Sequence, residues 1–208
     1  MKVPLFSYMT ITHLIFDLSE VLIRGLIGIE NTLGELLGMQ SDNLLHSFGG
    51  NDLRALCRNE VTEDEYLKRI IAKEKWNCSL QELKKIIRDN FHTIIGNMDE
   101  IILKLSENYT LILLSDHAQE WVKYIEEYHT FLQHFSYKSY SFQTGNIKDD
   151  MQSFLKLLSD LDVDPEVCIF IDDRKENVET AERCGIKGIV FTDRKQLVAE
   201  LKNFGIIV

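Results

Sequence analysis

Four short, continuously apolar segments are spread along this chain, and helix-length amphipathic stretches separate and follow most of them. The apolar segments are residues 13–16, 111–114, 167–171 and 188–191. Apolar runs this short and continuous are typical of strands buried on both faces, as in the parallel sheets of α/β proteins. The amphipathic stretches lie at about 99–107, 118–128, 149–161, 175–184 and 194–204. The alternation predicts an α/β fold with a doubly wound, Rossmann-like, mostly parallel sheet, and we expect a further short strand near 137–142.

Residues from about 25 to 96 break this alternation, because they contain no strand-like apolar run and several helix start signals. Two of the signals are capping boxes, formed by a hydroxyl residue and a glutamate three positions later: Thr62 with Glu65, and Ser79 with Glu82. They predict helices near 63–75 and 80–95. We therefore expect 25–96 to be an inserted helical cap, and 1–24 together with 97–208 to be the α/β core.

The composition excludes several classes of protein. With 45% hydrophobic and 27% charged residues, the 208-residue chain is typical of a globular protein rather than a disordered one. Its formal net charge of -10 argues against a general binder of nucleic acid or of an anionic membrane surface. The uncharged stretch 3–16 is shorter than the roughly 20 residues of a membrane span. Cysteines 57, 78, 168 and 184 lack CxxC spacing, so we expect reduced core thiols in a cytoplasmic protein.

Polar residues stand at the carboxyl ends of three of the apolar segments. Asp17 follows the first, Ser115 the second, and Asp172 with Asp173 the third. Ligands of open α/β sheets bind in the crevice outside these strand ends, so we expect the four side chains to meet there. Three carboxylates repel one another unless a hard divalent cation with oxygen ligands lies among them. The pattern predicts a Mg²⁺ site.

Four ordered motifs, at residues 15–22, 113–116, 145–148 and 170–177, resemble those of the haloacid dehalogenase (HAD) superfamily. The resemblance covers essentially the whole chain. It includes a helical cap inserted directly after the first motif, as in subfamily I members with a type 1 cap. The aspartate doublet followed by Asn177 is similar to a sugar-phosphatase-like branch. The resemblance implies a HAD-like hydrolase in which 1–24 and 97–208 form the catalytic core.

The resemblance also assigns roles to individual residues. It makes Asp17 the nucleophile that attacks a phosphoryl group and forms an aspartyl-phosphate, with Ser115 and Lys148 binding the phosphoryl oxygens. Asp116, in the second motif, is a further candidate for substrate binding. The resemblance implies four ligands of Mg²⁺: Asp17, Asp172, Asp173 and the backbone carbonyl of Ser19.

Position 19 departs from the pattern of the family. Most phosphatases of the family carry a second aspartate there, as the general acid and base, and this chain carries Ser19. General acid–base assistance is typically worth about 10²–10⁴-fold, so its loss should slow the reaction while nucleophile and metal remain. Glu20 is a candidate substitute, although neighbouring residues of an extended segment point to opposite sides.

Each assignment has a structural alternative. Asp17 and Ser115 are residue types that cap turns and helices, and Asp172 with Asp173 would suit the positive end of a helix. Lys148, which precedes an aspartate instead of the usual proline, would otherwise be a solvated surface lysine.

Weaker candidates lie near the motifs. His117 would contact the substrate or be a partly buried polar residue, and His13 is expected to be a hydrogen-bonded core histidine. Arg24 and Arg54, in or near the cap, are candidates for a phosphate contact or ordinary surface arginines. The aromatic residues at helical spacing are expected in the core or at an interface: Trp121, Tyr124, Tyr128 and Phe131.

The function predicted from these features is hydrolysis of a small phosphorylated metabolite, for which a sugar phosphate is one candidate, by a Mg²⁺-dependent phosphatase. The main alternative is a HAD-fold binding or regulatory protein with weak or no catalysis, because of Ser19. A second alternative is a haloacid dehalogenase, although those enzymes need no Mg²⁺ and the aspartate doublet argues against it. The sequence leaves the oligomeric state open.

Overall fold

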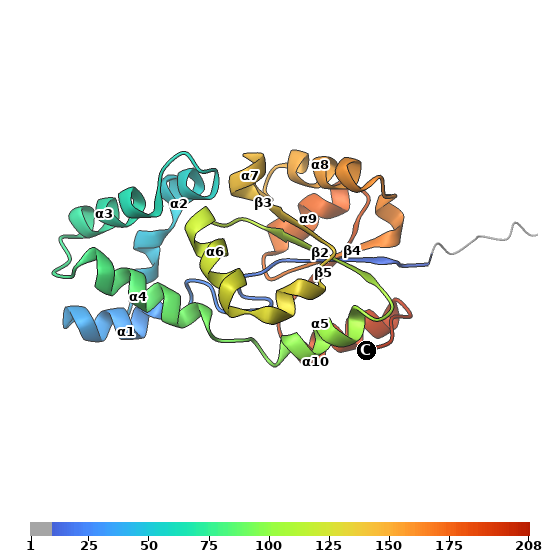
Figure 1. The fold of residues 1–208 in the computed structure, drawn as a ribbon, viewed down its shortest axis with the longest axis horizontal. Helices are drawn as coiled ribbons and strands as arrows, with labels where there is room; N and C mark the ends of the chain where they lie inside the picture. Colours follow the sequence, from blue (N-terminus) through green and yellow to red (C-terminus); the bar gives the residue numbers. More distant parts are fainter. Residues whose placement is uncertain (1–9) are drawn as a thin grey trace, which may run out of the picture.

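The computed structural model describes residues 10–208, so residues 1–9 of the expected core lie outside the described part. Five parallel strands form one sheet in the order β3-β2-β1-β4-β5 (Figure 1). The strands are β1 (His13–Phe16), β2 (Thr110–Ser115), β3 (Tyr137–Tyr140), β4 (Cys168–Asp172) and β5 (Lys187–Val190). All four apolar segments and the further strand near 137–142 are confirmed, with shifts of one or two residues at the ends of several strands.

The central position of β1 follows from the chain order. The chain first adds β2 and β3 on one side of β1 and then crosses to add β4 and β5 on the other side. The order of strands therefore reverses beside β1, and the crevice outside the strand ends is the expected place for a ligand in such a sheet. This topology places the residues that follow β1, β2 and β4 at one edge.

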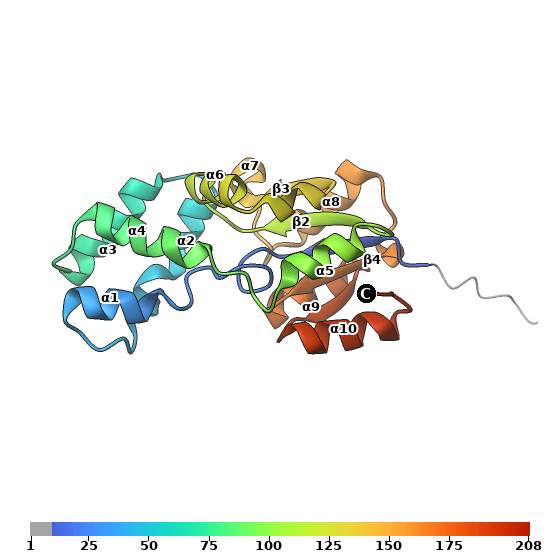
Figure 2. The ribbon, with the colours of Figure 1, turned by 60° about the horizontal axis from the view of Figure 1, so that its bottom comes forward.

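Helices cover both faces of the sheet, as a doubly wound fold requires (Figures 1 and 2). One face packs on α8 (Met151–Leu161) and α9 (Lys175–Arg183), and Ile15 points to that side. The neighbouring Leu14 and Phe16 point to the other face, because side chains alternate along a strand. The helices on that face are α5 (Met98–Leu105), α6 (Gln119–Tyr128) and α10 (Arg194–Asn203). Short helical segments complete the core: η2 (Thr130–His134), α7 (Ser141–Thr144) and η3 (Pro165–Val167).

A helical unit follows β1 and lies at the end of the sheet where the motif residues gather (Figure 1). It consists of α1 (Ile29–Leu37), η1 (Leu44–Phe48), α2 (Gly50–Cys57), α3 (Glu63–Glu74) and α4 (Leu80–Phe91). The capping boxes that start α3 and α4 are both confirmed, with hydroxyl-to-amide distances of 3.2 Å. We keep the term cap for residues 25–96, whose bounds stay a prediction.

The chain enters and leaves the cap along one short pair of segments. The amide of Arg24 donates to the carbonyl of Thr93 at 2.9 Å, and that of Ile95 donates to Leu22 at 2.9 Å. Ile23 and Ile94 form an antiparallel bridge between them. The two chain connections between cap and core therefore run side by side.

The four cysteines are buried to different extents. All four cysteines are free; Cys57 and Cys168 are buried, whereas Cys78 and Cys184 are only partly buried and are not core thiols in the strict sense.

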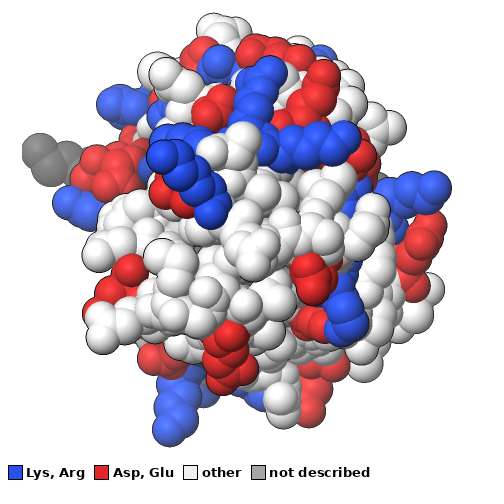
Figure 3. Space-filling view, turned by 90° about the vertical axis from the view of Figure 1, so that its left-hand side faces the viewer, with Lys and Arg blue, Asp and Glu red and all other residues white. Residues whose placement is uncertain are grey.

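The end of the cap that carries α1, α3 and α4 presents acidic and basic side chains side by side, around an uncharged area (Figure 3). Within residues 10–208, no helix is long and apolar enough to cross a membrane.

Candidate active site

Three carboxylates meet at the carboxyl edge of the sheet. Asp17 follows β1, Asp172 ends β4, and Asp173 is the next residue. One carboxylate oxygen of each lies within 4.8 Å of those of the other two. Asp17 and Asp172 are buried, at 6% and 0% exposure, so their charges have little water to stabilise them. The convergence that the sequence suggested for these three residues is present in the structure.

Lys148 lies between two of these carboxylates. Its Nζ is 2.7 Å from Oδ1 of Asp17 and 2.7 Å from Oδ2 of Asp172, and the residue is 2% exposed. Burial alone would lower the pKa of this lysine, but the negative charges of Asp17 and Asp172 outweigh it and raise the pKa. Burial raises the pKa of Asp17, and the charge of Lys148 opposes that effect. Lys148 is therefore a buried cation, and the alternative of a solvated surface lysine is wrong.

The loop before Lys148 is shaped by Gly145 and Asp116. Gly145 ends α7 with a φ of 74°, a left-handed conformation that glycine adopts without steric strain. Both carboxylate oxygens of Asp116 then accept the backbone amide of Lys148, at 3.0 and 3.2 Å. Asp116 thus orients the loop that carries Lys148, a role that the sequence did not indicate, and it also lines the cavity described below.

Asp172 is held by hydrogen bonds from its own side of the site. The side-chain amide of Asn177 donates to both of its oxygens, at 3.0 and 3.1 Å, and the amide of Arg174 donates at 2.8 Å. Asp173 is less enclosed, and burial together with the charge of Asp172 raises its pKa to about 6. The three carboxylates together with Lys148 carry two net negative charges, and they offer only oxygen atoms as ligands. This arrangement suits a hard divalent cation such as Mg²⁺.

The hydroxyl group of Ser115 is an unpaired polar group in a buried position. Ser115 is 1% exposed, and its Oγ has no hydrogen-bond partner within residues 10–208. It does not cap the next helix, because α6 begins after Ala118. Buried hydroxyl groups are normally hydrogen-bonded, so this arrangement suits a site that receives a ligand oxygen.

Ser19 and His117 form a second polar contact beside Asp17. Oγ of Ser19 lies 2.9 Å from Nε2 of His117. His117 is 3% exposed, and burial, with the nearby charge of Lys148, lowers its pKa to about 3, so the imidazole is neutral near pH 7. Glu20 is engaged elsewhere, since its carboxylate accepts the amides of Gly25 and Ile27 at 2.8 and 3.3 Å. These bonds hold Glu20 in the loop that leads to the cap, which argues against its use as a substitute acid.

A cavity of about 220 Å³ lies between this edge of the sheet and the cap. The core contributes the charged and polar groups at its base, among them Asp17, Ser19 and Lys148. The cap contributes residues from the loop before α1 and from α2 and α4: Gly25, Leu26, Leu53, Arg54, Cys57 and Phe91. A small molecule bound at Asp17 would therefore contact both parts of the chain.

The family model for haloacid dehalogenase-like hydrolases matches residues 14–191. The chain belongs to this family. A curated relative, flavin mononucleotide hydrolase 1 of Arabidopsis thaliana, a chloroplast protein, is 26% identical over 204 residues, covering 94% of this chain and 78% of the relative.

Solved structures of HAD-like hydrolases share the fold of this chain. A predicted HAD-like hydrolase of Porphyromonas gingivalis has a TM-score of 0.76 at 21% identity, with 96% of this chain and 100% of that one covered. A HAD-family enzyme of Bacteroides thetaiotaomicron, solved with magnesium and inorganic phosphate, has a TM-score of 0.70 at 21% identity, with 88% and 96% covered.

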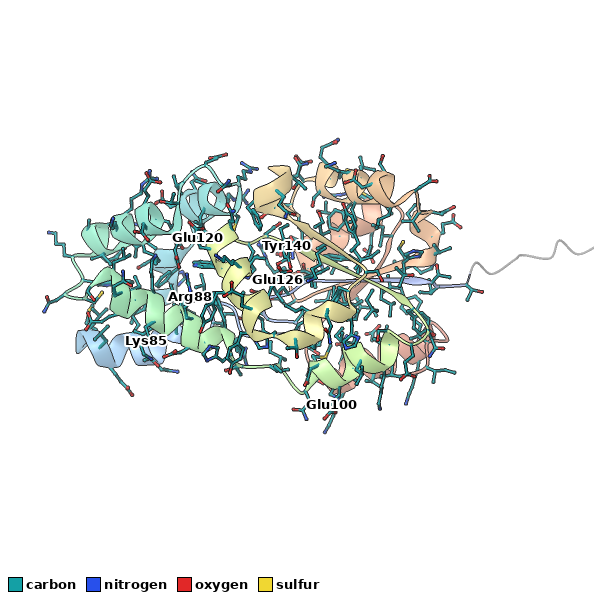
Figure 4. The ribbon with its side chains drawn as sticks, viewed as in Figure 1. Lys85, Arg88, Glu100, Glu120, Glu126 and Tyr140 are labelled. Carbon is teal, nitrogen blue, oxygen red and sulfur yellow. The ribbon has the colours of Figure 1, made fainter. Side chains whose placement is uncertain are left out.

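In this HAD-like hydrolase, several contacts join cap and core around the cavity. Nε1 of Trp121 donates to Glu63 at 2.7 Å, and the backbone amide of Glu63 donates to Glu120 at 3.3 Å. Arg88, on α4, forms two hydrogen bonds to the same buried Glu63 carboxylate. Figure 4 shows Arg88 and Glu120 near each other where the cap meets α6. The hydroxyl of Ser141 donates to the carbonyl of Cys57 at 2.7 Å.

The weaker candidates of the HAD-like hydrolase differ in their position relative to the cavity. Arg24 pairs with Glu20 at 2.8 Å and does not line the cavity, whereas Arg54 lines it and pairs with Asp149 at 2.5 Å. His13 is only half-buried and bonds to Thr12, so it is not a core histidine. Trp121 and Phe131 are buried, whereas Tyr128 is 52% exposed. The Arg54–Asp149 pair was missed because its members lie far apart in the sequence and neither belongs to a spacing pattern.

Proposed function

We propose that this chain is a Mg²⁺-dependent phosphatase that hydrolyses a small phosphorylated metabolite through an aspartyl-phosphate at Asp17. The observation that carries the proposal is the cluster of Asp17, Asp172 and Asp173 around the buried Lys148. The unpaired hydroxyl of Ser115, at the carboxyl end of the neighbouring strand β2, supports a ligand with oxygen atoms. The name of the Arabidopsis relative, a hydrolase of a phosphate ester, and the magnesium and phosphate of the Bacteroides structure also support it.

The metal would be held by Asp17, Asp173 and the backbone carbonyl of Ser19, with Asp172 adding its charge. When bound, Mg²⁺ would neutralise the repulsion between the Asp17 carboxylate and an anionic phosphate and so permit attack. Asp172 already accepts hydrogen bonds from Lys148, Asn177 and Arg174, and these bonds hold its carboxylate in place beside the cation site. A cluster of carboxylate oxygens is suited to binding Mg²⁺, and a haloacid dehalogenase, which works without metal, does not need one. The cluster therefore favours the phosphatase over the dehalogenase.

The residues of the chain divide the reaction between them. An oxygen of Asp17 attacks phosphorus, the bond from phosphorus to the leaving oxygen breaks, and that oxygen takes up a proton. Water then attacks the aspartyl-phosphate, which releases inorganic phosphate and restores Asp17. Lys148 and the Ser115 hydroxyl would stabilise the negative charge of the phosphoryl oxygens in both steps.

Removal of metal gives the first test. We expect release of inorganic phosphate from p-nitrophenyl phosphate to require added MgCl₂ and to fall to background with excess EDTA, because two net negative charges would then face the substrate. A phosphate-release assay of the full chain, with an Asp17→Asn variant beside it, measures this. Equal activity with EDTA and with Mg²⁺ contradicts the metal requirement, and halide release from a haloacid without metal would support the dehalogenase alternative.

A second test addresses Ser19. We expect Ser19→Asp to raise turnover by about 10²-fold or more, because it supplies the missing acid–base group beside Asp17. Ser19→Asn is the matched control, since it has the same shape without an ionisable group. A gain in kcat for Ser19→Asp alone supports a wild-type enzyme that is limited by proton transfer.

The same measurements separate the phosphatase from the binding-protein alternative. If wild type, Ser19→Asp and Asp17→Asn are equally inert across phosphate esters, the chain is better explained as a non-catalytic member of the family. The cytoplasmic location, the assignment to the sugar-phosphatase-like branch and the type 1 cap stay predictions.

A further inference from the structure

The wall that the cap contributes to the cavity is mostly apolar. Four of the six cap residues that line it have side chains without a charge or a strong hydrogen-bonding group: Leu26, Leu53, Cys57 and Phe91. Burial raises the pKa of Cys57 to about 12, so its thiol is neutral. From the core, Ile147 and Trp121 complete this wall.

Aromatic rings make up one side of that wall. The ring centroids of Phe91, His117 and Trp121 lie 5.7 to 5.9 Å apart in edge-to-face arrangements. All three residues are buried, at 1%, 3% and 3% exposure. Side chains packed in this way have little freedom to turn a polar atom toward a substrate.

Most polar side chains that line the cavity already have a partner. The exceptions are Nδ1 of His117 and Oδ1 of Asn177, which have none within residues 10–208, and Arg174, which only approaches Glu176, at 4.0 Å. Ser19 is bonded to His117 at 2.9 Å. Asp116 accepts the amide of Lys148, and the amide group of Asn177 donates to Asp172. On the cap side, the charged Arg54 is paired with Asp149 at 2.5 Å.

We infer that the site selects a compact phosphate monoester with an apolar leaving group, and that it discriminates against sugar phosphates. This inference rests on the proposed phosphatase function. Each sugar hydroxyl moved from water against this apolar wall would lose more hydrogen bonds than it gains there. The cavity of about 220 Å³ is also smaller than the roughly 300–1,000 Å³ of common ligand pockets, which favours a small leaving group over a flavin.

A matched pair of substrates tests the inference. Cyclohexylmethyl phosphate and glucose 6-phosphate are both esters of a primary alcohol on a six-membered ring, and they differ mainly in the hydroxyl groups. We expect kcat/KM of the wild-type chain with Mg²⁺ to be at least about 10²-fold higher for cyclohexylmethyl phosphate, since apolar pockets disfavour an added hydroxyl by about that factor. An equal or higher value for glucose 6-phosphate, or for FMN, overturns the inference.

Substitutions in the wall locate the selectivity. Leu53→Asn places a hydrogen-bonding group in the cap wall. We expect it to reduce the ratio of kcat/KM for cyclohexylmethyl phosphate to kcat/KM for glucose 6-phosphate by about tenfold, mainly through a lower KM for glucose 6-phosphate. Leu36→Asn is the matched control, because Leu36 lies on α1, is 38% exposed and does not line the cavity. An unchanged ratio in a folded Leu53→Asn variant contradicts the role of this wall.

Binding to Asp17→Asn separates this inference from the proposed function. We expect calorimetry with Mg²⁺ to show tighter binding of cyclohexylmethyl phosphate than of glucose 6-phosphate, even if no turnover is measured. Equal affinities, or binding of neither ester, overturn the inference. Hydrolysis of both esters at the same rate overturns it while the phosphatase function stands, whereas selective binding without any hydrolysis by the wild type removes only the proposed function.

Discussion

Asp17→Asn is expected to lower Mg²⁺-dependent phosphatase activity by roughly 10⁴-fold or more, the scale seen when a covalent nucleophile is removed. Asparagine has nearly the same shape and can still face Lys148, but its amide cannot form the aspartyl-phosphate. Single-turnover assays with a labelled phosphate ester, quenched in acid, measure both the rate and the phosphate bound to the chain. We expect acid-stable label on the wild type and none on the variant.

Asp164→Asn is a suitable control for this substitution. Asp164 caps the short helix η3 before β4, at the end of the sheet opposite the cavity. Its replacement should leave kcat/KM unchanged. Asp17→Asn activity close to that of this control would argue that another residue is the nucleophile.

Lys148→Met is expected to affect both stability and catalysis. Methionine retains much of the length of the side chain but removes the cation between Asp17 and Asp172, which are almost completely buried. Removing one partner of a buried ion pair typically costs about 3–5 kcal/mol in the free energy of unfolding. Phosphatase activity should fall as well, because the phosphoryl oxygens lose a positive charge.

The pH dependence of the free energy of unfolding of Lys148→Met shows why this variant is less stable. Without Lys148, nothing opposes the effect of burial that raises the pKa of Asp17, so ionisation of this carboxylate destabilises the fold as pH rises. The difference in the free energy of unfolding between wild type and variant should therefore be larger at pH 7 than at pH 4. Urea titrations at both values measure it, with Lys175→Met, on the exposed surface of α9, as the control. A difference independent of pH would point to lost packing rather than lost charge.

Much of the fold could be predicted from local patterns. The segment 13–16 forms β1 because a short apolar run is stable only where both its faces are covered. The boxes at Thr62 and Ser79 start helices because each satisfies two backbone amides at once. Such signals depend on neighbouring residues, so they can be found without knowledge of the tertiary structure.

The candidate site was predicted only in part. The positions of Asp17, Ser115 and Asp172 at strand ends could be read from the chain order, because parallel strands bring their carboxyl ends to one edge. The contacts of Asp116 with the amide of Lys148, and of Ser19 with His117, could not, because their members are 32 and 98 residues apart. The loss of Glu20 as a substitute acid likewise depends on the path of the loop that follows it.

The sequence by itself determined an acidic α/β chain with a helical insertion and three carboxylates at one edge of a parallel sheet. Only the tertiary structure decided what faces that edge. Leu53 and Phe91 lie on separate helices of the cap, and their apolar character is ordinary for amphipathic helices, so nothing local marks them as a cavity wall. The two side chains line the cavity only because the cap packs against the core. Which apolar residues line a cavity depends on this long-range packing rather than on residue type.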